Sequence, residues 1–118
     1  MRALHYVYIC TSNRSPAHQV WPSFWTKGPD WPSGGEIDIL EAVNRATNNQ
    51  MTLHTSPGCT QPAGVVQSGM TSGSNCSAGT NSSDGCTVIE EQPNSYGAGF
   101  NDAGGGVWAT QFDVSGIL

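Results

Sequence analysis

The stretch from Gly35 to Val43 reads G-E-I-D-I-L-E-A-V and sets three carboxylates among β-branched and aliphatic residues. Such a composition favours a strand. In a regular strand alternate residues share a face, so Glu36 and Asp38 would point one way and Glu41 the other, into the apolar layer. Because an unpaired buried charge is costly, we predict a β-bulge at Ile39-Leu40 that returns Glu41 to the carboxylate face.

Three acids on one face suit the cleavage of a glycosidic bond. Glu36 and Glu41 would lie about four strand steps apart, roughly 13 Å between Cα atoms. If both side chains lean over the shorter Asp38, their carboxyls approach the ~5–5.5 Å separation of retaining glycosidases, in which one carboxylate attacks the sugar and the other donates and recovers a proton. Asp38 would hydrogen-bond the nucleophile and keep the two pKa values apart. The alternative is a solvated edge strand whose charges face water.

A second strand is predicted at Gln50–Thr55, joined to the first by the polar turn of residues 44–48. Gln50, Thr52 and His54 alternate with Met51 and Leu53 and therefore share one face. Antiparallel pairing would bring His54 roughly opposite Asp38. A lone histidine is usually structural, but this one lies on the carboxylate face, which favours a role in the site.

Several motifs surround the acidic strand in a fixed order. They are W-P-S-F-W at 21–25, G-P-D-W-P at 28–32, G-G-E-I-D-I-L-E-A-V-N at 34–44, N-Q-M-T-L-H-T at 49–55, N-S-Y-G-A-G-F-N at 94–101 and G-G-G-V-W-A-T at 104–110. Together they resemble glycoside hydrolase family 16, and within it the fungal laminarinase-like endo-β-1,3(4)-glucanases. The resemblance covers about Trp21 to Val114.

The resemblance implies a role for each acid. Glu36 matches the family's nucleophile, Asp38 its assisting carboxylate and Glu41 its general acid/base. The expected activity is hydrolysis of β-glucans by a retaining double displacement, with no cofactor and no metal ligand set.

Aromatic residues supply the expected sugar contacts, because sugars stack their C–H faces on Trp or Tyr. By the resemblance, Trp31 lines the sugar-binding cleft and His54 lies beside the catalytic carboxylates. Trp31 is flanked by Pro and Gly, which favours a cleft position over a core position. We also assign Trp25 to substrate binding, although core packing is an equal alternative for Trp25 and Phe24.

Composition supports an all-β domain and a neutral substrate. The chain has 118 residues, 15 Gly, 7 Pro and only 11% charged residues, which is typical of a turn-rich β protein. The net charge of −5 argues against nucleic acid or an anionic membrane surface as a partner. No stretch approaches the ~18–20 apolar residues of a membrane span. The β-glucan substrate is thus the one partner expected, and the native domain is expected to be a monomer.

The resemblance implies a concanavalin-like β-jelly-roll sandwich, but such domains are much larger than this chain. We therefore expect an incomplete domain at 21–118, with strands missing at both ends, preceded by an atypical segment at 1–20. That segment is a poor signal peptide, since it lacks a long apolar region and a small-residue cleavage site. Secretion is still expected for the parent enzyme.

Three of the four cysteines, Cys59, Cys76 and Cys86, fall in a Ser- and Gly-rich loop at 56–85, and two of these are expected to form a disulfide; Cys10 stands apart. After the loop, Cys86–Glu90 and Val107–Val114 are predicted strands. In the second of these, Trp108, Phe112 and Val114 are expected to face the sandwich core.

Two further functions stay open. A non-catalytic glucan-binding or inactive fragment would explain the missing strands but not the paired acids. A transglycosylase of the same family would use the same acids, with a sugar in place of water as the acceptor.

Overall fold

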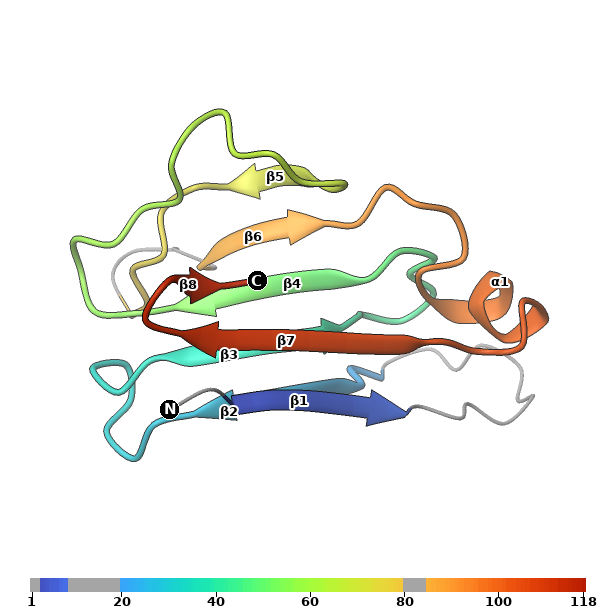
Figure 1. The fold of residues 1–118 in the computed structure, drawn as a ribbon, viewed down its shortest axis with the longest axis horizontal. Helices are drawn as coiled ribbons and strands as arrows, with labels where there is room; N and C mark the ends of the chain where they lie inside the picture. The colour runs from blue at the N-terminus through green and yellow to red at the C-terminus, as the bar shows by residue number, and fades with distance from the viewer. Residues whose placement is uncertain (1–2, 9–19, 80–84) are drawn as a thin grey trace.

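The computed structural model describes residues 3–8, 20–79 and 85–118 and is built almost entirely from strands (Figure 1). The strands are β1 (Ala3–Tyr8), β2 (Ser23–Lys27), β3 (Glu36–Glu41), β4 (Gln50–His54), β5 (Met70–Gly73), β6 (Cys86–Ile89), β7 (Val107–Asp113) and β8 (Gly116–Ile117). One short helix, α1, spans Gly97–Asp102. The all-β prediction is confirmed. No helix of the described ranges is long and apolar enough to cross a membrane.

The strands form two antiparallel sheets. The larger has the order β2-β3-β4-β6-β5 and the smaller the order β1-β7-β8. Figure 1 shows β7 crossing in front of β3, and these two strands are in contact. The two layers therefore form a β-sandwich, as expected, with β3 in the second position of the larger sheet and covered by β7.

The predicted bulge is present. Along the β3–β4 ladder Asp38 pairs with Thr52, and the next pair is Glu41 with Gln50, so two residues of β3 oppose one of β4. The β2–β3 ladder shifts at the same place. An extra residue in one strand shifts the alternation of side chains by one, and this is how Glu41 rejoins the face of Asp38.

The core lies beside this bulge. Its buried apolar residues are Ile39, Leu40, Ala42, Cys76, Ala78, Cys86 and Phe100. Phe100 of α1, a helix that the sequence did not predict, packs on Trp108 of β7 with ring centroids 4.4 Å apart. The short apolar run around the bulge thus supplies three of the seven buried apolar residues, Ile39, Leu40 and Ala42.

The structure contradicts one core alternative, for Phe24 and Trp25, and one core prediction, for Phe112 and Val114. Phe24 and Trp25 are exposed on β2, which is an edge strand of its sheet. On β7, Phe112 is 53% exposed and Val114, beyond the end of the strand, is fully exposed, whereas Thr110 is buried. Along β7 only Thr110 is buried, although the apolar alternation pointed to its neighbours, so alternation alone did not identify which residues would be covered.

The loop at 56–85 is more ordered than its composition suggested. It contains β5, which pairs with β6, and a bridge between Thr60 and Asn75. A disulfide joins Cys76 to Cys86, which confirms the predicted pairing of two loop cysteines. Cys59 is a free, exposed thiol, and Cys10 lies outside the described residues.

Candidate active site

Three neighbouring strands bring the predicted site residues together. On the β2–β3 ladder Trp25 pairs with Asp38 and Lys27 with Glu36. On the β3–β4 ladder Glu36 pairs with His54. Because residues directly opposite each other share a face, the carboxylates, the imidazole and the Trp25 ring gather on one side of the sheet.

Asp38 is the buried centre of this group. Its side chain is only 3% exposed, and its pKa is raised from 3.8 to about 7. The main cause is loss of water on burial, followed by repulsion from Glu41 and Glu36 and a hydrogen bond with Glu36. Because this pKa lies near neutrality, Asp38 is protonated in part of the molecules at pH 7 and can then donate the hydrogen bond to Glu36.

His54 reaches this centre along a diagonal. Its Nε2 lies 3.2 Å from Oδ2 of Asp38, although its ladder partner is Glu36 and that of Asp38 is Thr52. The predicted position opposite Asp38 is thus off by two residues, but the predicted proximity is correct. The same Oδ2 has no well-directed hydrogen bond within the described residues, so the two side chains are in close contact without a hydrogen bond.

The ligand atoms of Glu36, Asp38 and His54 all lie within 4.8 Å of one another, a grouping that could hold a metal ion. The hydrogen bond between the two acids and the imidazole contact already account for these positions.

Glu41 is held by different neighbours. The indole Nε1 of Trp21 donates to its Oε1 at 2.7 Å, and the amide Nε2 of Gln50 donates to its Oε2 at 3.3 Å. Its backbone N–H donates to Oδ1 of Asn49 at 3.1 Å. Glu41 is therefore fixed by one aromatic and two amide side chains, while Glu36 is fixed by Asp38.

Sequence reasoning missed Trp21, Asn49, Gln50 and Gly85 as supports of the site. Gly85 precedes β6 with φ +81°, and a Cβ there would lie 2.7 Å from Nδ1 of His54. Trp21, Asn49 and Gln50 belong to the motifs quoted above, but nothing in their spacing assigns them to Glu41. Gly85 ends a Ser- and Gly-rich loop in which one glycine cannot be told from another.

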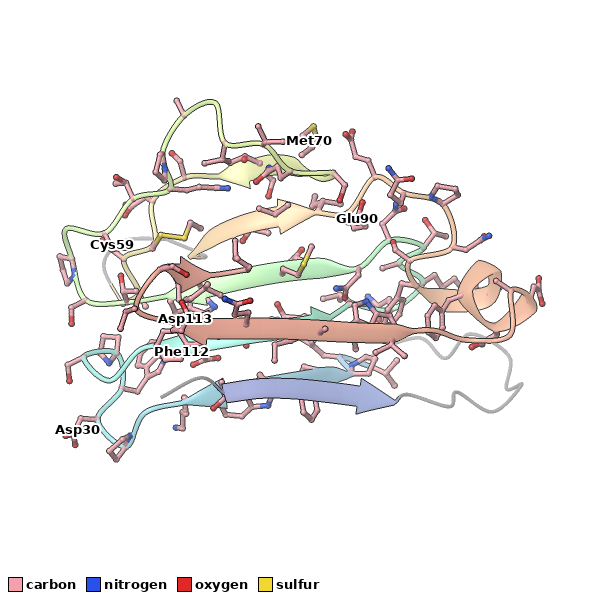
Figure 2. All side chains as sticks on the ribbon, viewed as in Figure 1. Asp30, Cys59, Met70, Glu90, Phe112 and Asp113 are labelled. Carbon is pink, nitrogen blue, oxygen red and sulfur yellow. A yellow bond between two sulfur atoms is a disulfide. The ribbon has the colours of Figure 1, made fainter. Side chains whose placement is uncertain are left out.

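The predicted aromatic contacts are exposed. Trp25 is 45% exposed, and Nζ of Lys27 lies 5.8 Å from its ring centroid, a cation–π arrangement. Trp31 is 46% exposed in the loop between β2 and β3, where Figure 2 labels its neighbour Asp30. This exposure is inconsistent with core packing of Trp25, and it leaves both indole rings accessible for stacking on a sugar.

Paired carboxylates beside exposed indoles on a β-sandwich are the features of a polysaccharide-cleaving glycoside hydrolase. Residues 5–118 match the family model described as "XgeA-like, catalytic GH16 domain". The chain belongs to glycoside hydrolase family 16.

Fungal relatives agree with this assignment. The chain is 46% identical over 100 residues to a probable glycosidase of Schizosaccharomyces pombe. The matched region is 82% of this chain and 24% of that protein. It is 44% identical over 92 residues to the endo-1,3(4)-beta-glucanase xgeA of Emericella nidulans. That match takes in 78% of this chain and 14% of the relative. The chain thus spans about a quarter or less of the length of these relatives.

Solved structures give the same picture. The GH16 Laminarinase 16A of Phanerochaete chrysosporium, with two beta-glucans in its donor and acceptor sites, has a TM-score of 0.73 and 42% identity over 79% of this chain and 32% of its own. An elongating GH family 16 beta-1,3-glucosyltransferase has a TM-score of 0.68 and 46% identity over 79% of this chain and 31% of its own. These neighbours have the jelly-roll fold that was expected from the sequence, and this chain matches a part of that fold.

Proposed function

We propose that this chain carries the catalytic strand of a retaining endo-β-1,3(4)-glucanase. The observation that supports this most is the bulged strand β3, which brings Glu36, Asp38 and Glu41 close enough for both glutamates to raise the pKa of Asp38. A module that only binds glucan would need Trp25 and Trp31 but no such group of acids.

In the proposed first step, the carboxylate of Glu36 attacks the anomeric carbon and Glu41 protonates the departing glycosidic oxygen. In the second step, Glu41 takes a proton from water, which attacks the same carbon and releases Glu36. Asp38 in its protonated form donates a hydrogen bond to Glu36 and so orients the nucleophile. The exposed indoles of Trp25 and Trp31 would stack on the sugar rings.

Transglycosylation is the second candidate. It uses the same glycosyl-enzyme, with a sugar hydroxyl in place of water in the second step. The observation in its favour is the 46% identity to the elongating GH family 16 beta-1,3-glucosyltransferase. We further propose secretion of the protein, because the Cys76–Cys86 disulfide suits an oxidising compartment.

Activity is best tested in a complete domain. We define the chimeric domain as the endo-1,3(4)-beta-glucanase xgeA of Emericella nidulans in which this chain replaces the segment it matches. The chimeric domain should release reducing sugar from laminarin and from mixed-linkage β-glucan. Longer products formed from added laminarioligosaccharides would instead identify the transglycosylase.

The two glutamates can be distinguished by azide. Glu41→Gln should spare the first step for an aryl glycoside with a good leaving group, and azide should then restore turnover and yield a β-glycosyl azide. Glu36→Gln should abolish the glycosyl-enzyme, while Glu91→Gln, an exposed acid beyond β6, should leave the rate unchanged. A β-glycosyl azide formed by the Glu36 variant, with no azide rescue of the Glu41 variant, would exchange the two roles, because azide that replaces a missing nucleophile gives the α-glycosyl azide.

A further inference from the structure

The bulge in β3 leaves backbone groups that the strand ladder does not pair. Between the Asp38–Thr52 and Glu41–Gln50 pairs, β3 has two residues for one on β4. Bulges interrupt the ladder in this way, and buried backbone N–H and C=O groups need partners from elsewhere. Ile39 and Leu40 are both buried, so water does not provide them.

The side chain of Asn49 provides both partners. Its Nδ2 donates to the carbonyl oxygen of Ile39 at 2.9 Å, and its Oδ1 accepts from the N–H of Glu41 at 3.1 Å. One amide group thus spans the bulge from the residue before Leu40 to the residue after it. An amide offers a donor and an acceptor side by side, which an aliphatic side chain or an ionised carboxylate of the same size does not.

The backbone of Asn49 is anchored as well. Its N–H donates to Oγ of Ser95 at 3.0 Å, and its carbonyl accepts from the N–H of Glu90 at 2.9 Å. The residue is 1% exposed. Every backbone and side-chain polar group of Asn49 therefore has a partner, and the residue links β3 to the segment that follows β6.

We propose that Asn49 is the positioning residue that holds the β3 bulge and thereby keeps Glu41 on the carboxylate face, a role that rests on the proposed function of Glu41. Loss of the bulge would shift the alternation by one residue. Leu40 would then join Asp38, and Glu41 would turn to the opposite face. Asn49 acts through Glu41 and has no contact with the substrate in this proposal.

The adjacent Asn48 is a matched control. Its Nδ2 donates to the carbonyl oxygen of Glu90 at 2.6 Å, so it also closes the β3–β4 turn onto the end of β6, but it does not touch the bulge. We would compare Asn49→Leu and Asn49→Asp with Asn48→Ala in the chimeric domain. Asn49→Asp keeps the acceptor for Glu41 and loses the donor to Ile39.

The kinetic readout separates positioning from stability. For both Asn49 variants, kcat on laminarin should fall by about 10²-fold, as expected for loss of general acid–base catalysis, with KM nearly unchanged. Formation of the glycosyl-enzyme from an activated aryl glycoside should be preserved. Asn48→Ala should lower Tm but keep kcat. Equal kcat for the Asn49 and Asn48 variants would overturn the proposal.

A second measurement is independent of turnover. Hydrogen exchange of the Glu41 amide in the chimeric domain should accelerate at least about tenfold in Asn49→Leu, because that N–H loses its acceptor. It should not change in Asn48→Ala. If the unmodified chimeric domain had no activity, the proposed function would fail, and exchange at Glu41 would still decide the role of Asn49. Unchanged exchange in Asn49→Leu would reject that role.

Discussion

His54 stands opposite Glu36 in the β3–β4 ladder, yet its Nε2 lies 3.2 Å from Oδ2 of Asp38. The imidazole therefore leans along the strand toward the most buried carboxyl of the site. Diagonal neighbours in an antiparallel pair lie within reach of a long side chain. This diagonal contact brings the imidazole of His54 and the carboxyl of Asp38 together, although they are not paired on the ladder.

The first prediction concerns the glycine beneath His54. Gly85→Ala in the chimeric domain should lower the free energy of unfolding by about 2–4 kcal/mol, from strain at positive φ and overlap with buried neighbours. The added Cβ would lie 2.7 Å from both Nδ1 of His54 and Cγ2 of Thr52. Displacement of His54 should also lower kcat. Chemical denaturation and laminarin kinetics would check both effects.

Gly79 offers a matched control for this substitution. Its φ is +80°, against +81° for Gly85, but a Cβ there meets nothing within 4 Å. Gly79→Ala should therefore show only the conformational penalty, about 1–2 kcal/mol, and unchanged kcat. Equal kcat losses for the two variants would show that contact with His54 is not the cause.

The second prediction is a pH dependence of stability. The pKa of Asp38 rises from 3.8 to about 7 on folding, so the native state binds the extra proton between these values. The contribution of Asp38 to the free energy of unfolding is fully present below about pH 4. It is lost as pH rises from there through the folded pKa of about 7, by about 1.4 kcal/mol for each pH unit and up to about 4 kcal/mol in total, and it changes no further at higher pH. Asp38→Asn, which cannot ionise, should remove this loss.

The measurement is urea denaturation of the chimeric domain and its Asp38→Asn variant at pH 5 and pH 8. The difference between the two proteins isolates Asp38, because every other titrating group is common to both. A wild-type protein that gains stability relative to the variant from pH 5 to pH 8 would show that the pKa of Asp38 is lowered on folding.

The third prediction concerns Trp21, which is 67% exposed and donates to Oε1 of Glu41. Trp21→Phe keeps an aromatic ring but removes the donor. Hydrogen bonds to charged groups are worth about 1.5–3 kcal/mol when protected from water. The bond from the exposed Trp21 to Glu41 is worth less than that, so kcat should fall by about tenfold. Trp31→Phe is the comparison and should act mainly on KM. A change in KM alone for Trp21→Phe would mean that Trp21 serves only as a sugar platform.

The fourth prediction is that the 118-residue chain expressed by itself associates and hydrolyses little laminarin. Several large apolar residues are exposed on it, among them Phe112 of β7, labelled in Figure 2. Exposed apolar surface and open sheet edges favour association, and ordering costs about 1–2 kcal/mol per residue. Size-exclusion chromatography would detect the association, and dye binding would detect the exposed apolar surface. A monodisperse monomer with a cooperative thermal transition, whose turnover Glu36→Gln abolishes, would contradict this prediction.

The acidic strand, its bulge and the hairpin with His54 were predictable because each is a local consequence of alternation. Glu41 could not stay in the apolar layer, so a bulge had to lie between Asp38 and Glu41, and the structure has it there. The disulfide within the loop followed from three nearby cysteines, although the choice of Cys76 and Cys86 did not.

The sequence by itself determined which carboxylates share a face, since side-chain alternation is fixed within one strand. Only the tertiary structure decided what holds them there. Asn49, Trp21 and Gly85 reach the site through ladder register and through contacts between separate strands, and neither is encoded in a local pattern. The burial that raises the pKa of Asp38 has the same origin, because desolvation depends on every neighbour that a side chain meets after the sheets have assembled.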